Sequence, residues 1–530
     1  MKQNYFQSRS QQNILPPCGP ENAKVDLNVT KHDPTVCRIF LYDNQVLFHP
    51  ADNPAVVKAL TIYENSLEAN ADTKWVRKTV RRKRELFTTF ERNKKTIGIT
   101  YQGFVDTIIQ ALVESGCAFD LEDKRSAISA FNTALKPDFS LMKGFRFSQE
   151  KLLTTFLSAD RSGLLGAPTR YGKTTLMINT IRAYPNANIV VIAPGVDLVR
   201  QLYKDITGER GIKDREVKLI CSGSKTKYMS FETNGVTICS ADSLDKVDGG
   251  TPDIVLADEP HALVTQTRLP LIDKFTKARR YGFGATLKGR YDGRDKLITG
   301  VFGPVITQRT YKEAVEEGAI CPISVIFVRV PVTPIYSYDR DGCYNECLFK
   351  SSKMANLTSI LCNEIIPEDW QTLIFIKHEE QADLYMNTIG TDTTVAMAKR
   401  MSSKERDVIT EKMRTNQIKR CLCTKIYVQG VTFSDVRVLI NAEAGGNNTS
   451  AIQKPGRLAE IRPGKKCGIV FDFLFDDSRI VNSYNGNRAS GAGAMVADSN
   501  ARKKAYEEMG YDVHIVDTVC EAKELFDSLK

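Results

Sequence analysis

Two successive series of short apolar segments constrain the fold of this chain more than any other feature. Each segment is nearly continuous in apolar residues, as strands buried on both faces of a parallel sheet are. The first series lies between residue 145 and about residue 319 and comprises GLLGAP, NIVVIAPG, VKLICSG, GVTICSA, DIVLADEP and RRYGFGATL. The second begins after residue 322 and comprises PISVIFVRV, QTLIFIK, CLCTKI, VRVLINAE and KCGIVFDFLF. Amphipathic stretches between the segments favour crossover helices, so we expect an α/β fold with two tandem doubly wound parallel sheets.

The length of the chain, 530 residues, leaves room for one further domain. Domains hold roughly 100–200 residues, so this length predicts about three of them. Residues 36–135 mix short apolar runs with charge, which favours a small α+β domain ahead of the two parallel sheets. We therefore expect an N-terminal accessory domain at residues 1–140, one α/β domain at 141–320 and a second at 321–530.

The composition favours an ordinary globular protein of a reducing compartment. Hydrophobic residues make up 42% and charged residues 26% of the chain, and its apolar runs are strand-sized, so we expect no membrane span. The N-terminus has no apolar signal-peptide core, and the 13 cysteines form no CxxC pair. We expect buried free thiols and a cytoplasmic protein, in a bacterial host if a phage encodes it. The net charge of +10 allows a polyanionic partner without demonstrating one.

A strand, a loop and a helix-like run surround the tripeptide GKT. The loop and the start of the following helix comprise Ala167, Pro168, Thr169, Arg170, Tyr171, Gly172, Lys173, Thr174 and Thr175. Such a loop points backbone N–H groups at phosphate oxygens beside the positive end of a helix. Lys173 would reach the β- and γ-phosphates of ATP, and the Thr174 hydroxyl would hold Mg²⁺. The tripeptide alone leaves open a simple turn with a solvated lysine.

An acid pair ends a later apolar strand of the same series. The segment DIVLADEPHAL places Asp258 and Glu259 at the carboxyl end of that strand, where open parallel sheets bind their ligands. Asp258 can therefore meet the Mg²⁺ held by Thr174, and Glu259 can orient and deprotonate an attacking water. Two solvated turn carboxylates are the alternative. Together with the GKT loop, the pair predicts a nucleoside triphosphatase site.

With these two motifs in place, the sequence resembles superfamily 2 helicases. The segment Asp258-Glu-Pro-His261 resembles their DExH box, and other helicase motifs follow in the usual order over residues 145–475. These motifs are FRFSQ, with Arg146 and Gln149 as the adenine-reading residues, VIAPGVDLVRQ (Ia), ICSADSL (Ib), GATL (III), TLIFIKHEEQADLY (IV), LCTKIYVQGVTF (V) and QKPGR (VI). The whole plan is most similar to phage helicases of the UvsW type, which act on branched DNA.

The resemblance implies two RecA-like lobes that bind ATP and Mg²⁺. The residues that it implies as catalytic are Lys173, Asp258, Glu259, His261, Arg457 and Arg462. It implies nucleotide contacts from Arg146, Gln149, residues 167–175 and Gly430, and metal contacts from Thr174 and Asp258. It also implies phosphate-backbone contacts from motifs Ia, Ib, IV and V, for which the candidates are Arg200, Ser240, Lys377 and Thr424. Each of these four is as readily an ordinary surface residue.

The chain departs from the family pattern in both halves of the motor. Ala167 stands where the phosphate loop has its first glycine, and Arg170 stands where the family usually has another. Motif VI usually reads QxxGRxxR, but here Glu460 holds the last position and Arg462 follows two residues later. Pro463 and Gly464 favour a helix end near Glu460, which would let Arg462 take the place of the missing arginine.

A basic run in the N-terminal domain is a candidate nucleic-acid contact. Seven of the eleven residues from Lys74 to Arg84 are Lys or Arg, and Arg77, Arg81 and Arg84 would share one face of a helix. A solvated face is the usual role of such a run. Beside a helicase core, we expect contact with the phosphates of DNA.

Three functions remain open from the sequence. The first is an ATP-driven DNA helicase or translocase that acts as a monomer on branched or forked DNA in replication, recombination or repair. The second is an RNA helicase or the motor subunit of a restriction system. The third is a non-catalytic ATP-dependent clamp on nucleic acid, which Arg170 and Glu460 keep open. DNA-stimulated phosphate release separates the first from the third, and a comparison of DNA with RNA separates the first from the second.

Overall fold

The structure is a computed structural model that describes residues 36–69, 77–125, 135–224, 234–247, 252–285, 287, 295–331, 344, 352–390, 393–396, 401–424, 435–445, 448–476 and 490–530. The chain divides into two compact units. The first unit takes in the chain up to Ala167 together with Gly172–Gln308. The second takes in Pro168–Tyr171 and Arg309–Lys530. None of the helices within the described ranges is long and apolar enough to cross a membrane.

The N-terminal domain is a mixed α+β fold within the first unit. Its five-stranded sheet has the order β5-β6-β2-β1-β7, in which β1 pairs antiparallel with β2 and parallel with β7. The strands are β1 (Cys37–Leu41), β2 (Gln45–His49), β5 (Thr88–Arg92), β6 (Lys95–Tyr101) and β7 (Phe119–Asp123). Helices α1 (Pro54–Ala59) and α2 (Val105–Glu114) pack against each other, and the Asn53 side chain caps α1.

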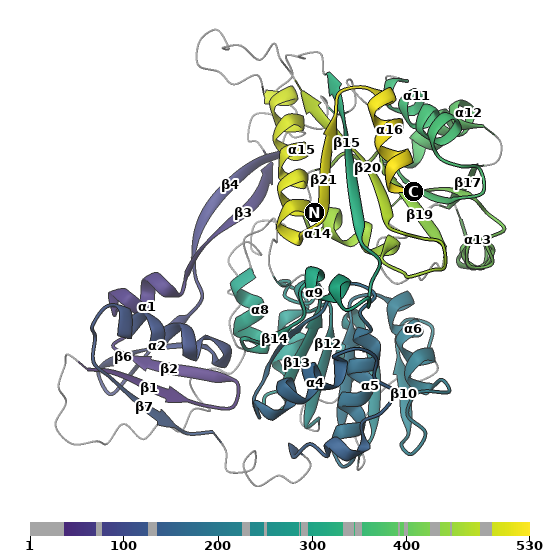
Figure 1. Ribbon diagram of the computed structural model, residues 1–530. Coiled ribbons are helices and arrows are strands. Elements are labelled where there is room, and N and C mark those ends of the chain that lie inside the picture. The colour runs from purple at the N-terminus through teal and green to yellow at the C-terminus, as the bar shows by residue number, and fades with distance from the viewer. Residues whose placement is uncertain are drawn as a thin grey trace, which may run out of the picture. The chain divides into compact units, whose positions relative to one another are not determined.

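A separate two-stranded hairpin extends from this domain (Figure 1). It joins β3 (Thr61–Ala69) to β4 (Arg77–Glu85) in an antiparallel ladder. The described part of the basic run is therefore a strand, so the shared face that a helix would have given to its arginines does not form. Side chains alternate along a strand, so Arg81 and Arg84 lie on opposite faces of β4. Pairing with the preceding strand β3 overrides the local pattern, which contains few apolar residues to mark a period.

Both α/β lobes contain seven strands, and they share one strand order. The first sheet runs β10-β11-β9-β12-β13-β8-β14 and the second runs β17-β18-β16-β19-β20-β15-β21. In chain order, both sheets read third, fourth, second, fifth, sixth, first, seventh. All pairs in both sheets are parallel. The expected fold class, two tandem RecA-like lobes behind a small mixed domain, is confirmed.

The first lobe alternates strands with crossover helices. Its strands are β8 (Gly163–Gly166), β9 (Ile189–Ala193), β10 (Val217–Ile220), β11 (Val236–Ser240), β12 (Ile254–Asp258), β13 (Arg279–Gly284) and β14 (Val305–Gln308). Its helices are α4 (Gln149–Ser158), α5 (Lys173–Ala183), α6 (Val196–Thr207), α7 (Leu269–Asp273) and α8 (Asp295–Phe302).

The second lobe repeats this plan after α9 (Tyr311–Glu316). Its strands are β15 (Ile323–Pro331), β16 (Gln371–Phe375), β17 (Thr393–Ala396), β18 (Arg420–Cys423), β19 (Val436–Asn441), β20 (Gly468–Asp476) and β21 (Asp512–Val516). Its helices are α11 (Lys353–Ile360), α12 (Ala382–Ile389), α13 (Ser403–Arg414), α14 (Asn448–Gln453), α15 (Ser490–Met509) and α16 (Val519–Leu529).

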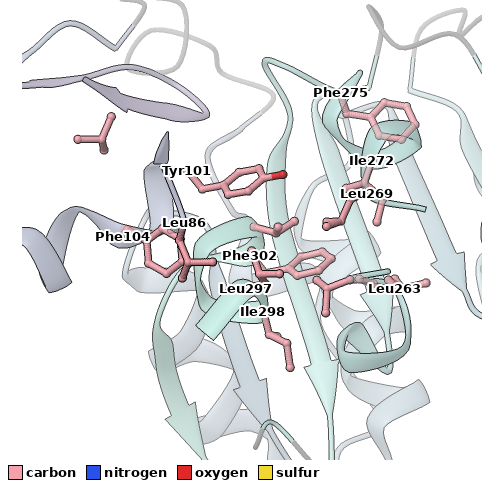
Figure 2. Packing of buried hydrophobic residues seen from close by; sticks show 14 of the residues in the cluster. Leu86, Tyr101, Phe104, Leu263, Leu269, Ile272, Phe275, Leu297, Ile298 and Phe302 are labelled. Carbon is pink, nitrogen blue, oxygen red and sulfur yellow. The ribbon is translucent and has the colours of Figure 1, made fainter. Parts of the chain in front are cut away.

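The N-terminal domain and the first lobe share one hydrophobic core. Leu86, Tyr101 and Phe104 of the N-terminal domain pack with Leu297 and Ile298 of α8 and with residues around α7 (Figure 2). The Tyr101 hydroxyl donates to Asp273 Oδ2 across this core at 2.8 Å, although both residues are buried. Burial of a polar group is tolerated when its hydrogen bond is made, so this contact fixes the domain to the lobe.

Candidate functional site

The predicted phosphate loop lies at the carboxyl edge of the first sheet, between β8 and α5. The Ala167 N–H donates to the Gly284 carbonyl at 3.0 Å, which joins the loop to the segment that resembles motif III. Gly172 has φ +100°, and a Cβ at this position would lie 2.4 Å from Gln149 Nε2. Only glycine fits there, because the conformation is left-handed and the Gln149 side chain occupies the space. Gln149 is buried and accepts from the Arg146 N–H at 2.9 Å.

Lys173 and Glu259 form the centre of the site. Lys173 begins α5, and its Nζ lies 2.5 Å from Glu259 Oε1. Each side chain is 14% exposed, so the pair is shielded yet reachable by water. Glu259 has φ +51°, a left-handed conformation that is strained for a residue with a side chain. Such strain persists where the surrounding structure determines it, and it gathers at functional sites.

The DExH segment holds two further titratable groups beside this pair. The pKa of Asp258 is raised from 3.8 to about 7, because burial and, to a smaller extent, the Glu259 carboxylate outweigh the opposing effect of Lys173. His261 is buried, and its Nδ1 lies 3.4 Å from Glu259 Oε2. One ammonium group thus faces two carboxylates that are buried at the end of β12. Carboxylate and hydroxyl oxygens are ligands that Mg²⁺ prefers, so Asp258 and Thr174 in the first turn of α5 fit such an ion.

Arg170 and Glu460, the two departures from the family pattern, contact each other. The segment Pro168–Tyr171 belongs to the second unit, where Arg170 Nη1 lies 3.3 Å from Glu460 Oε2. Arg462 Nη2 lies 3.5 Å from the other oxygen of the same carboxylate. Arg170 has φ +73°, and its burial lowers the pKa of the guanidinium. The arginine in the phosphate loop and the glutamate in motif VI are therefore opposite charges of one cluster.

The helix of motif VI ends before Glu460, as its proline and glycine predict. A 3-10 helix spans Pro455–Leu458, and Ala459 is its C-cap. Arg457 lies on this helix and is buried. Arg462 follows in irregular chain, and its side chain is 39% exposed. Gly430 lies outside the described residues.

The four predicted backbone contacts differ in accessibility. Arg200 is exposed on α6, and its Nη2 donates to the Ser222 carbonyl at 3.3 Å. Ser240 is buried, and its hydroxyl donates to the Ser243 hydroxyl at 3.0 Å. Lys377 is half-buried, with its Nζ 4.9 Å from the centre of the Tyr344 ring, and Thr424 is half-buried.

The basic residues of the hairpin lie on two faces of β4. Arg81 is exposed and stacks over Tyr63 at 4.6 Å from the ring centre, and Tyr63 is 53% exposed. Arg84 lies on the opposite face, where it forms an ion pair with the buried Glu64 at 3.1 Å. Nothing is described of the side chain of Arg77. The structure thus separates Arg81 from Arg84, which the helical prediction had placed together.

Sequence reasoning missed two charged residues that the fold makes prominent. Arg268 makes hydrogen bonds to three segments that leave the carboxyl edge of the first sheet. Lys454 in the second lobe lies 2.6 Å from Glu443 Oε2 and is almost fully buried. No motif marks Arg268. Lys454 belongs to the quoted QKPGR segment, but only the fold shows its partner.

Two family models match the chain in the order of its two lobes. The family described as "Type III restriction enzyme, res subunit" matches residues 127–289, which include the phosphate loop and the DExH segment. The family described as "Helicase conserved C-terminal domain" matches residues 352–462, up to the end of motif VI. Together, the two matches identify residues 127–289 and 352–462 as the paired motor domains of superfamily 2 helicases.

Curated relatives of the helicase are distant. The chain is 22% identical over 341 residues to the DNA 3'-5' helicase XPB of Mycobacterium tuberculosis, which covers 62% of this chain and 60% of the relative. It is 22% identical over 232 residues to the ATP-dependent helicase Lhr-Core of Methanocaldococcus jannaschii, which covers 42% of this chain and 25% of the relative. The helicase thus spans less than two thirds of the length of these relatives.

Solved structures that resemble the helicase share its fold at low identity. A fragment of a putative HsdR subunit of a type I restriction enzyme from Vibrio vulnificus aligns with a TM-score of 0.52 and 15% identity, covering 78% of this chain and 74% of that one. T4 UvsW aligns with a TM-score of 0.39 and 13% identity, covering 91% of this chain and 99% of that one. The likeness to the HsdR fragment concerns the fold alone, and the UvsW-type assignment stays a prediction.

Proposed function

We propose that the helicase is an ATP-driven DNA translocase that unwinds or remodels branched DNA. The observation that carries the ATP part is the 2.5 Å pair between Lys173 and Glu259 at the ends of two parallel strands. In this proposal Lys173 exchanges Glu259 for the β- and γ-phosphates when ATP binds. Released from the lysine, Glu259 orients the attacking water and accepts its proton. The pair thus keeps the base occupied until substrate arrives.

The remaining predicted residues take supporting roles in the same site. Thr174 and Asp258 would hold Mg²⁺, which neutralises charge on the phosphates when it is bound. The N–H groups of the loop would cradle the phosphates, and Arg146 and Gln149 would read the adenine. Arg457 and Arg462 would supply positive charge to the γ-phosphate as it leaves, and His261 would hold Glu259 in place.

The DNA part of the proposal rests on the hairpin. Exposed basic side chains that follow a strand, with an exposed aromatic ring among them, are suited to phosphate contacts and to base stacking. Arg81, Lys83 and Tyr63 provide this combination on one face of the β3–β4 hairpin. These three side chains suit phosphates and the faces of bases of any identity, so we propose binding that is independent of sequence.

Phosphate release with different nucleic acids tests the proposal. The helicase is mixed with ATP and Mg²⁺ and with a forked DNA, a linear DNA duplex or single-stranded RNA. We expect the forked DNA to stimulate turnover most. Strongest stimulation by RNA would favour an RNA helicase, and equal stimulation by both DNA forms would remove the preference for branches. ATP-dependent binding without turnover would favour a clamp.

A further inference from the structure

We propose that Arg268 is a positioning residue that couples nucleic-acid contact to the acid loop of the ATP site. The proposal deepens the function proposed above and rests on it. Arg268 precedes α7, and neither the phosphate loop nor the DExH box contains it. Its guanidinium reaches three segments that leave the carboxyl ends of β9, β11 and β12, which are neighbours in the first sheet.

The hydrogen bonds of Arg268 define this junction. Its Nη1 donates to the Ala262 carbonyl at 2.9 Å, three residues after Glu259. Its Nη2 donates to the Pro194 carbonyl at 3.1 Å, in the segment that resembles motif Ia. Its Nε and Nη2 donate to the two oxygens of Asp242 at 2.9 and 3.1 Å, in the segment that resembles motif Ib.

This pattern argues against a direct phosphate contact by Arg268. A guanidinium carries five N–H donors in a fixed plane, and the contacts to Asp242, Pro194 and Ala262 engage four of them. The Arg268 side chain is 21% exposed, whereas that of Asp242 is 68% exposed. Arg268 therefore faces the interior of the edge, whereas the Asp242 carboxylate that it holds faces solvent.

A second cation of the same segment holds the other end of the motif Ib turn. Lys274, just after α7, donates to the carbonyls of Leu244 and Val247. The apolar side of α7 is anchored by Leu269 and Ile272, which pack with Leu263 in the core (Figure 2). Arg268 and Lys274 thus hold the turn at its start and its end from one rigid helix.

Arg268 can therefore transmit movement from the nucleic-acid segments to the acid loop. A displacement of the Asp242 turn or of the Pro194 loop by nucleic acid pulls on the same planar group that holds Ala262. Because Ala262 closes the short helix that begins after Glu259, the displacement reaches the base without crossing flexible chain. A lysine cannot replace the arginine here, since an ammonium group is a point charge that does not span three acceptors.

The test compares basal with stimulated turnover in the full chain. Phosphate release is measured without nucleic acid and with saturating forked DNA for the wild type, Arg268→Lys and Asp242→Asn. We expect the ratio of stimulated to basal turnover to fall by about 2–30-fold in both variants, the range seen for residues that carry coupling. Arg161→Lys is the matched control, because Arg161 forms an exposed pair with Asp106 at 3.1 Å in the same unit. Its ratio should equal that of the wild type.

The outcomes separate coupling from simple damage. A structural role would lower basal and stimulated turnover by the same factor and leave the ratio unchanged, which would overturn the proposal. A wild-type ratio in Arg268→Lys would also overturn it. If Arg268→Lys fails to fold, Asp242→Asn decides, because it keeps the two carbonyl contacts. A wild type that no nucleic acid stimulates would instead refute the proposed function itself, and this inference with it.

Discussion

The two lobes share a strand order, but they use the same ion pair in different ways. In each lobe a Lys–Glu pair lies beyond the end of the fifth strand: Lys173–Glu259 at 2.5 Å after β12 and Lys454–Glu443 at 2.6 Å after β19. Lys454 is 4% exposed and Lys173 is 14% exposed. A common topology therefore places both glutamates after the fifth strand, although Lys173 follows the first strand of its lobe and Lys454 the fifth. The surroundings decide what the charges do.

The surroundings differ in how the charges balance. Lys454 also donates to Asn441 Oδ1 at 2.7 Å, and Asn441 donates to Asp472 at 2.8 Å. Asp472 in turn pairs with the buried Arg502, so this network has two cations for two carboxylates. In the first lobe, Lys173 faces both Asp258 and Glu259. The charges of the second network bond to one another, whereas the two neighbouring carboxyl groups of the first lobe suit a metal ion.

The largest effect on turnover should come from breaking the Lys173–Glu259 pair, which water can reach. Glu259→Gln keeps the shape of the side chain but cannot accept the proton of water, so we expect turnover to fall about 10²–10⁴-fold. ATP binding should persist, because Lys173 loses its competitor for the phosphates. Phosphate release and the binding of a fluorescent ATP analogue measure the two quantities. Wild-type hydrolysis by this variant would show that another residue is the base.

Breaking the buried Lys454–Glu443 pair should lower the free energy of unfolding instead. Lys454→Met leaves Glu443 buried without its cation, and removal of one partner from a buried pair costs about 3–5 kcal/mol. Urea unfolding measures this free energy. Lys173→Met is the matched control and should cost less, because water reaches its partner Glu259. An equal cost for the two variants would remove the distinction between the lobes.

Lys173 and Glu259 could be predicted from the sequence because each belongs to a short local motif. GKT and DEPH each place a functional residue at the end of an apolar strand, and parallel strands bring such ends to one edge. The fold class followed from the same apolar runs. The Lys454–Glu443 pair and its network could not be predicted from the sequence. Asn441, Lys454 and Arg502 come together only when β19, β20 and α15 pack in the folded lobe.

The basic run shows a different limit. Its Lys and Arg residues have no apolar period, so helix and strand are equally compatible with the local sequence. The preceding strand β3 decides between them, because its pairing with β4 is not encoded in the run itself. Glu259 and Arg170 add conformations that local propensity disfavours, because both have positive φ angles.

The β3–β4 hairpin offers a similar comparison, between exposed cations and a cation paired with a buried carboxylate. Arg81 stacks on Tyr63 and Lys83 forms an exposed pair with Glu85 at 3.4 Å, whereas Arg84 pairs with the buried Glu64. Replacing Arg81 and Lys83 by Ala should lower the log–log salt slope of DNA binding by about 1.8, at about 0.9 for each lost phosphate contact. Arg84→Ala is the control and should leave the slope unchanged. Titrations at several salt concentrations measure it, and equal slopes in all proteins would assign the run to a solvated surface.

The smallest effect concerns the pH dependence of stability and a lysine whose hydrogen bonds all go to backbone carbonyl groups. Lys465 donates to the carbonyls of Val436, Leu458 and Glu460, and burial lowers its pKa from 10.5 to about 8. Between these two values the unfolded chain binds more protons than the folded one, so this group makes stability rise with pH. The unfolding free energy of the wild type relative to Lys465→Met should therefore increase by about 1 kcal/mol between pH 7 and pH 9. The subtraction removes every titrating group that the two proteins share. Urea unfolding at each pH gives the difference, and a constant value would mean that Lys465 keeps its charge through this range.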